Sequence, residues 1–204
     1  MLRALLLEAF SYAARRGLGY RDFFLALAAA RGAPASADAR IAAVVRDLSQ
    51  LAASAPARWR VPEGAILVDG LGVAEAYSIY AELSAAGAPP FLEVGVNPRG
   101  DTLGFKQRLG VPTMAHASRK LGTATLYRST DKLIHSLPPM PPEELAAVLE
   151  RELGERLRRI AEEARRRGAP IATDHAYDVV CRGGLCWLCH GAKCPLSRLA
   201  LVLS

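Results

Sequence analysis

The chain has 204 residues, 51% of them hydrophobic, which suits one domain of ordinary size with a substantial core. Its formal net charge of +6 permits binding of phosphate-rich partners without requiring it. No apolar run approaches the ~20 residues that span a bilayer. The short run Leu5–Leu7 is interrupted by Glu8 and followed by two arginines. The sequence therefore predicts a cytoplasmic protein with no membrane partner and no cleaved signal.

Arginine supplies most of the positive charge, because lysine occurs at only four positions. Asparagine occurs once, as Asn97. A low content of thermolabile amides together with many arginines is typical of thermophilic proteins. A GC-rich genome produces the same bias, so the two explanations stay open.

The first 60 residues are predicted to form a helical N-terminal extension, and residues 61–204 are predicted to form the core. Apolar residues recur at helical spacing between Ile41 and Leu51, behind Ser36 as a candidate N-cap.

From Gly64 onward, predicted strands alternate with predicted helices. The predicted strands are Ala65–Val68, Phe91–Val96, Thr123–Tyr127 and Pro170–Thr173. The predicted helices are Ala74–Ala86, Thr102–Leu109 and Pro142–Arg167. This alternation indicates an α/β fold with a mostly parallel sheet and helices on both faces.

Candidate functional residues directly follow two of the predicted strands. Asp69 follows Ala65–Val68, and Asp174 and His175 follow Pro170–Thr173. Because ligands of such sheets bind outside the carboxyl ends of the strands, these side chains fall on the edge where a site is expected.

A second candidate pair has the spacing D-x-x-x-H. Asp131 and His135 lie one helical turn apart, which places both side chains on one helix face. Oxygen and imidazole ligands together suit zinc, manganese or iron.

Four short motifs carry a family resemblance. In chain order they are Val68-Asp69-Gly70-Leu71-Gly72, Asp131-Lys132-Leu133-Ile134-His135, Thr173-Asp174-His175-Ala176-Tyr177 and Cys189-His190-Gly191-Ala192. This order is similar to that of the metal ligands in the alkaline phosphatase superfamily. The last motif, with Pro195-Leu196-Ser197 after it, resembles the end of PglZ domains. The resemblance covers about residues 61–204 and implies an alkaline-phosphatase-like core.

The resemblance also implies two sets of metal ligands and an activity. One divalent ion, zinc or manganese, would be shared by Asp131, His135 and His190. The second would be held by the three remaining ligands, Asp69, Asp174 and His175. Two such ions clamp the attacking and leaving oxygens of a displacement at phosphorus. The implied function is that of a metal-dependent phosphatase or phosphodiesterase acting on a nucleotide-type substrate.

The stretch from Val111 to Arg119 resembles the family motif P-T-x-T-x-x-S-R, in which the second threonine attacks phosphorus. That position is Ala115 in this chain. Thr113 and Ser118 are the candidate substitutes, and attack by a metal-bound hydroxide is the alternative. Arg119 is a candidate substrate-binding residue, although a solvated basic turn is the simpler explanation.

All four cysteines lie close together, as Cys181, Cys186, Cys189 and Cys194. Such a cluster is typical of a structural zinc site. Two disulfides are the second interpretation, and an iron–sulfur cluster is the third. Zinc or disulfides would each hold the loop that carries His190.

Two further functions remain open from the sequence. The replacement at Ala115 is compatible with a non-catalytic PglZ-like module that kept its fold. The basic charge and the cysteine cluster are compatible with a zinc-stapled protein that binds nucleic acid.

Overall fold

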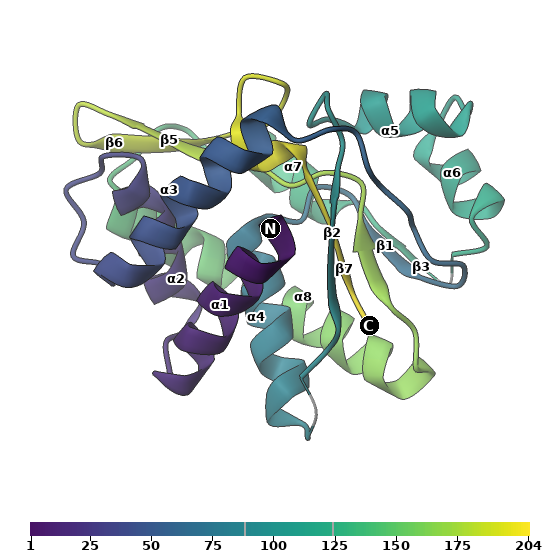
Figure 1. The fold of residues 1–204 in the computed structure, drawn as a ribbon, viewed down its shortest axis with the longest axis horizontal. Coiled ribbons are helices and arrows are strands. Elements are labelled where there is room, and N and C mark those ends of the chain that lie inside the picture. Colours follow the sequence, from purple (N-terminus) through teal and green to yellow (C-terminus); the bar gives the residue numbers. More distant parts are fainter. Residues whose placement is uncertain (88, 124) are drawn as a thin grey trace.

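The computed structural model describes residues 1–87, 89–123 and 125–204 (Figure 1). The helices are α1 (Leu2–Arg15), α2 (Tyr20–Ala30), α3 (Ala39–Ser54), α4 (Val73–Ala85), α5 (Thr102–Leu109), α6 (Met114–Lys120), α7 (Ser129–Ser136) and α8 (Pro142–Arg167), with the 3-10 helix η1 (Pro195–Arg198). The strands are β1 (Ile66–Val68), β2 (Leu92–Val96), β3 (Thr125–Tyr127), β4 (Ile171–Thr173), β5 (Asp178–Arg182), β6 (Leu185–Cys189) and β7 (Leu199–Leu203). No helix among these residues is both long and apolar enough to cross a membrane.

Five strands form one mixed sheet in the order β2-β7-β4-β1-β3. β1 is parallel to β3 and β4, whereas β7 is antiparallel to both of its neighbours, β2 and β4. The prediction of an α/β fold is confirmed. The predictions of a mostly parallel sheet and of an alkaline-phosphatase-like core are wrong, because a reversed strand lies inside the sheet.

The route of the chain explains why β7 is reversed. Between β4 and β7 the chain forms the β5–β6 hairpin and the η1 turn, with no crossover helix. A parallel neighbour requires a long crossover to the opposite edge of the sheet. Since none is present, the chain re-enters the sheet from the edge at which β4 ended.

Alternate strand residues face two different sides of the sheet. Ile66, Val68 and Ile171 belong to a large apolar cluster that includes residues of α1 to α4 and α8. Leu67 faces the other way and packs with Phe105 of α5 and Met114 of α6. In Figure 1, α5 and α6 lie to the right of the sheet and α1 to α3 to its left. Helices therefore pack against both faces.

The N-terminal helices share the core with the rest of the chain, because residues of α1, α2 and α3 lie in the same cluster as β1 and β4. Helix α3 is capped by Asp38, whose side chain accepts hydrogen bonds from the backbone N–H groups of Arg40 and Ile41. The predicted N-cap, Ser36, is therefore wrong by two residues. The boundary predicted at residue 60 stays a prediction.

Two helices have the bounds that the sequence predicted. α5 begins after Asp101, which caps it, and ends at Gly110, which has a φ of 64°. α8 begins with Pro142 and ends at Gly168, which has a φ of 60°. The residues that mark these helix starts and ends act through local conformation alone. The predicted strand Thr123–Tyr127 is observed as Thr125–Tyr127, and residue 124 lies outside the described residues.

Candidate metal centre

Four strands of the sheet run in the same direction, so their carboxyl ends meet at one edge. Asp69 directly follows β1, Asp174 directly follows β4, and Arg128 directly follows β3. Asn97 follows β2 in the same way. β7 runs in the opposite direction, but the carboxyl ends of the other four strands still meet at this edge. Polar side chains are expected to gather at the carboxyl ends of these four strands.

The first candidate ligand group is buried and consists of Asp69, Asp174 and His175. Nε2 of His175 lies 3.9 Å from Oδ1 of Asp69 and 3.7 Å from Oδ2 of Asp174. One ligand atom from each residue lies within 4.8 Å of the other two. These spacings place three donor atoms around one point.

The second candidate ligand group is more exposed and consists of Asp131, His135 and His190. Nε2 of His135 lies 3.4 Å from Oδ1 of Asp131 across one turn of α7 and 2.9 Å from Nε2 of His190. His190 comes from the loop after β6. Because the His135 side chain is 57% exposed, solvent and a substrate have access from this side.

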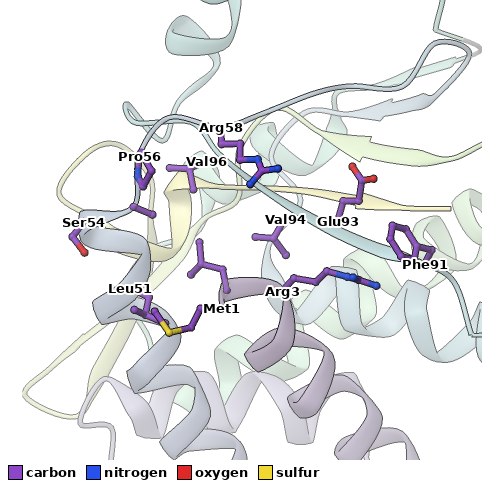
Figure 2. A pocket seen from close by; sticks show the side chains of 12 residues that line it. Met1, Arg3, Leu51, Ser54, Pro56, Arg58, Phe91, Glu93, Val94 and Val96 are labelled. Atoms are coloured by element: carbon purple, nitrogen blue, oxygen red, sulfur yellow. The ribbon is translucent and has the colours of Figure 1, made fainter.

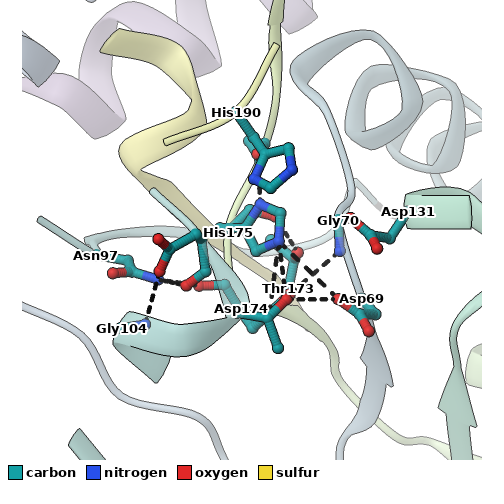
Figure 3. A network of polar contacts seen from close by, with 12 residues as sticks. Asp69, Gly70, Asn97, Gly104, Asp131, Thr173, Asp174, His175 and His190 are labelled. Carbon is teal, nitrogen blue, oxygen red and sulfur yellow. Dashed lines mark hydrogen bonds and ion pairs between the residues drawn. The ribbon is translucent and has the colours of Figure 1, made fainter. Parts of the chain in front are cut away.

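The two groups are neighbours (Figure 3). The rings of His175 and His190 stack with centroids 5.2 Å apart and an interplanar angle of 22°. Gly70 lies between the groups with a φ of 72°, and a Cβ atom there would be 3.4 Å from Cβ of Asp131 and 3.6 Å from Cε1 of His175. Glycine at this position allows the loop after β1 to turn sharply between the two groups.

Hydrogen bonds fix the loop after β1 to the loop after β4. The backbone N–H of Gly70 donates to Oδ1 of Asp174 over 3.1 Å, and the N–H of Leu71 donates to Oγ1 of Thr173 over 3.1 Å. The buried Asn97 amide donates to the backbone carbonyl of Asp174 over 3.1 Å, as drawn in Figure 3. The single asparagine of the chain thus ties the β2 loop to the β4 loop.

The charges of the first group are costly without a cation. Burial, followed by the charge of the neighbouring Asp174, raises the pKa of Asp69 to about 6. Burial also raises the pKa of Asp174. In both cases the protein destabilises the ionised carboxylate, which is the form that binds a metal ion.

The imidazole rings are held in forms that can bind a metal ion. Nδ1 of His175 lies 2.6 Å from the backbone carbonyl of Ala176, which only accepts, so Nδ1 carries the hydrogen and Nε2 offers its lone pair to the group. Burial, followed by the charges of His175 and His135, lowers the pKa of His190 and favours its neutral form.

One buried carboxylate oxygen fits a bound cation. Oδ2 of Asp174 is buried without a hydrogen-bond partner among the described residues. An unpaired buried carboxylate oxygen costs free energy unless a cation or donor lies beside it. The mixed oxygen and nitrogen donors of both groups suit zinc or manganese. The residues present therefore fit the ions that the sequence resemblance implies.

Thr102 is a site residue that sequence reasoning missed. Its hydroxyl donates to Oδ1 of Asp69 over 3.0 Å and lies 3.2 Å from Nε2 of His175. It is the first residue of α5, the helix that follows β2 in the chain. The rule that polar residues beyond aligned strand ends form the site would have found it, had it been applied to the loop after Asn97.

The predicted nucleophile candidates make different contacts. Thr113 is exposed, caps α6 and lies 2.7 Å from Nδ1 of His116. The Ser118 hydroxyl is hydrogen-bonded to Thr123, and Arg119 is exposed on α6. Among the described residues, these three side chains have no hydrogen bond or ion pair with either ligand group. Their catalytic and substrate-binding roles stay predictions.

The four cysteines form two disulfides, Cys181–Cys186 and Cys189–Cys194. The first joins residues directly opposite one another in the β5–β6 hairpin. The second closes the loop that contains His190. Of the three interpretations left open by the sequence, the structure has the disulfides.

Comparisons of the chain with protein-family models, with curated proteins and with solved structures find no match.

A groove lies elsewhere on the protein (Figure 2). It has a volume of about 680 Å³ and lies between the start of α1, the end of α3 and the edge strand β2. Its lining includes Met1, Leu51 and Val94 but no residue of either ligand group. This groove is therefore separate from the candidate metal centre.

Proposed function

We propose that the chain is a metal-dependent phosphoric ester hydrolase that binds two divalent ions, zinc or manganese. The observation that carries the proposal is the pair of adjacent ligand groups with the Thr102 hydroxyl beside one of them. Paired divalent ions about 3.5–4 Å apart are a recurrent arrangement for displacement at phosphorus. Such ions supply Lewis-acid polarisation of the phosphoryl oxygens and neutralise their charge.

The two ligand groups differ in solvent exposure and would therefore have different roles. The buried group of Asp69, Asp174 and His175 would hold its ion rigidly, because strand ends and hydrogen-bonded loops fix all three. The group that includes His135 is open to solvent and would face the entering ester. This arrangement supports a site that accepts substrate from the α7 side.

Thr102 is the hydroxyl best placed to attack phosphorus. It lies within hydrogen-bond reach of a carboxylate and an imidazole of the buried group, and it begins a helix. Asp69 accepts the hydroxyl hydrogen bond and so orients the oxygen lone pairs. The replacement at Ala115 is then no argument against catalysis, because Ala115 is exposed on α6.

The test is hydrolysis of 4-nitrophenyl phosphate and bis(4-nitrophenyl) phosphate with zinc or manganese. Asp174→Ala should abolish activity because it removes a ligand of the buried group. Asp47→Ala, an exposed carboxylate of α3, is the matched control and should keep full activity. Absence of hydrolysis by the unmodified protein with either metal would refute the proposal and favour a non-catalytic binding module.

The nucleotide-type substrate and the resemblance to PglZ domains remain expectations from the motifs. The structure gives the nucleic-acid alternative less support than the sequence did, because the cysteines form disulfides where a zinc staple was considered.

A further inference from the structure

Arg128 is a basic residue at the candidate metal centre to which sequence reasoning gave no role. It directly follows β3, and its Nε lies 3.8 Å from Oδ2 of Asp69. Among the described residues, no other lysine or arginine forms an ion pair with a carboxylate of either ligand group. Arg99, the basic residue in the nearby β2 loop, is paired with Asp101.

Arg128 and Thr102 contact the two oxygens of one carboxylate. Oδ1 of Asp69 accepts the hydrogen bond of the Thr102 hydroxyl, and Oδ2 of Asp69 lies 3.8 Å from Nε of Arg128. Both side chains therefore lie beside the same ligand of the buried group. The remaining donors of Arg128 form no hydrogen bond within the described residues, and its side chain is 62% exposed.

The charges of the site indicate which anion it would bind. Three ligand carboxylates set against two divalent ions leave one positive charge, and Arg128 raises this to two. A phosphate monoester carries about two negative charges at neutral pH, whereas a phosphodiester carries one. The planar guanidinium also matches two phosphoryl oxygens at once.

We propose that Arg128 binds the phosphoryl oxygens of the substrate and makes the site selective for phosphate monoester dianions over diesters. The inference rests on the proposed function and specifies its substrate class. It assigns to Arg128 the substrate-binding role for which the sequence offered Arg119 as a candidate.

The experiment compares Arg128→Gln, Arg128→Lys and Arg46→Gln, the last at an exposed position of α3, each loaded with zinc and checked for equal metal content. Calorimetry measures binding of inorganic phosphate and of dimethyl phosphate. Losing a charged hydrogen-bond donor should weaken phosphate binding about tenfold to a hundredfold in Arg128→Gln. Dimethyl phosphate carries one negative charge, which the two ions and the three carboxylates already balance without Arg128. Its binding should therefore change by less than about threefold. Arg128→Lys keeps the positive charge but loses the planar guanidinium. Its affinity for phosphate should therefore lie between those of Arg128→Gln and the unmodified protein.

Steady-state kinetics provide the second measurement. In Arg128→Gln the ratio of kcat/KM for 4-nitrophenyl phosphate to that for bis(4-nitrophenyl) phosphate should fall at least about tenfold. Arg46→Gln should leave both measurements unchanged.

The inference is overturned if Arg128→Gln and Arg46→Gln bind phosphate equally well, or if Arg128→Gln loses metal and so acts by holding the ligands. If the unmodified protein hydrolyses both esters and Arg128→Gln has the same ratio of kcat/KM values, the role of Arg128 is refuted and the proposed function stays intact. A protein that hydrolyses neither ester refutes the proposed function, whereas the binding comparison still tests Arg128.

Discussion

Thr102 shows how one side chain can change the interpretation of a site. The sequence placed the nucleophile in the stretch from Val111 to Arg119, where Ala115 replaces the expected threonine. The structure instead places the Thr102 hydroxyl 3.0 Å from Asp69 and 3.2 Å from His175. Thr102 is therefore the proposed nucleophile, and attack by a metal-bound hydroxide stays the alternative.

Replacing Thr102 separates its proposed role as nucleophile from a structural role. Thr102→Ala should lower kcat about a hundredfold or more, because the attacking oxygen is lost. Thr102→Ser keeps the hydroxyl and should retain most of the activity. Metal content, measured in both variants, should be unchanged. Equal kcat values for Thr102→Ala and the unmodified protein would assign the attack to another oxygen.

Glu75 is a second buried acid, outside the two ligand groups. It is fully buried, and it accepts a hydrogen bond from the Tyr20 hydroxyl. Its Oε2 has no hydrogen-bond partner among the described residues. Burial raises the pKa of Glu75 above its ordinary value. The folded protein therefore binds this proton more tightly than the unfolded chain does.

Stability at high pH should rise when Glu75 is made neutral. Because its folded pKa is raised, its contribution to stability is fully present below the unfolded pKa and is lost as pH rises through the folded pKa. Glu75→Gln lacks this titration. The difference in unfolding free energy between Glu75→Gln and the unmodified protein should therefore be larger at pH 8 than at pH 5 in urea titrations. Glu82→Gln, at an exposed position of the same helix, should show no such trend. A pH-independent difference for Glu75→Gln would contradict the argument.

At the scale of elements, two loops from different parts of the chain support the site together. The backbone N–H of Gly191 donates to the carbonyl of Gly100 over 2.8 Å, so the His190 loop rests on the loop that leads to Thr102. A Cβ atom at Gly100, which has a φ of 59°, would be 2.3 Å from Oγ of Ser197. This close approach requires glycine. The disulfide Cys189–Cys194 closes the same loop.

Removing that disulfide should affect one ligand group and spare the other. Cys189→Ser combined with Cys194→Ser frees the loop that carries His190, so the exposed group loses its preorganised ligand. We expect metal content to fall from two ions per chain to one. Cys181→Ser with Cys186→Ser removes the other disulfide, which does not enclose His190, and should retain both ions. Identical metal content in the two double variants would contradict the role given to the loop.

The elements differ in how far the sequence determines them. The bounds of α5 and α8 were predictable because capping residues and glycine act locally. The direction of β7 was not, because the segment Leu199–Leu203 is buried at every residue and shows no alternation. The site was partly predictable for a related reason. Residues that directly follow a strand, such as Asp69, Asp174 and Arg128, can be found from the sequence. The contacts of Arg128 and Thr102 with Asp69 arise only in the folded chain.

At the scale of the whole molecule, the N-terminal helices are tied to the half of the chain that bears the site. Arg31, just after α2, donates to both carboxylate oxygens of Asp178, over 3.0 and 2.5 Å. Asp178 is 2% exposed and also accepts from the backbone N–H of Leu196 over 3.1 Å. This buried ion pair connects α2, β5 and the turn that follows the His190 loop.

Breaking the pair should destabilise the whole fold. Asp178→Ala leaves the Arg31 charge largely buried and unpaired, which should cost about 3–5 kcal/mol of unfolding free energy. Glu8→Ala breaks the exposed pair between Glu8 and Arg40 and should cost less than about 1 kcal/mol. Urea denaturation followed by circular dichroism measures both. Equal losses would show that the N-terminal helices are not held by this contact.

The central claim is that the two ligand groups hold two divalent ions at one edge of the sheet. Diffraction at the metal absorption edge, from crystals grown with zinc or manganese, tests it most directly. The account predicts two anomalous peaks per chain, one among Asp69, Asp174 and His175 and the other among Asp131, His135 and His190. No peak at either group, or peaks only elsewhere on the protein, would contradict it.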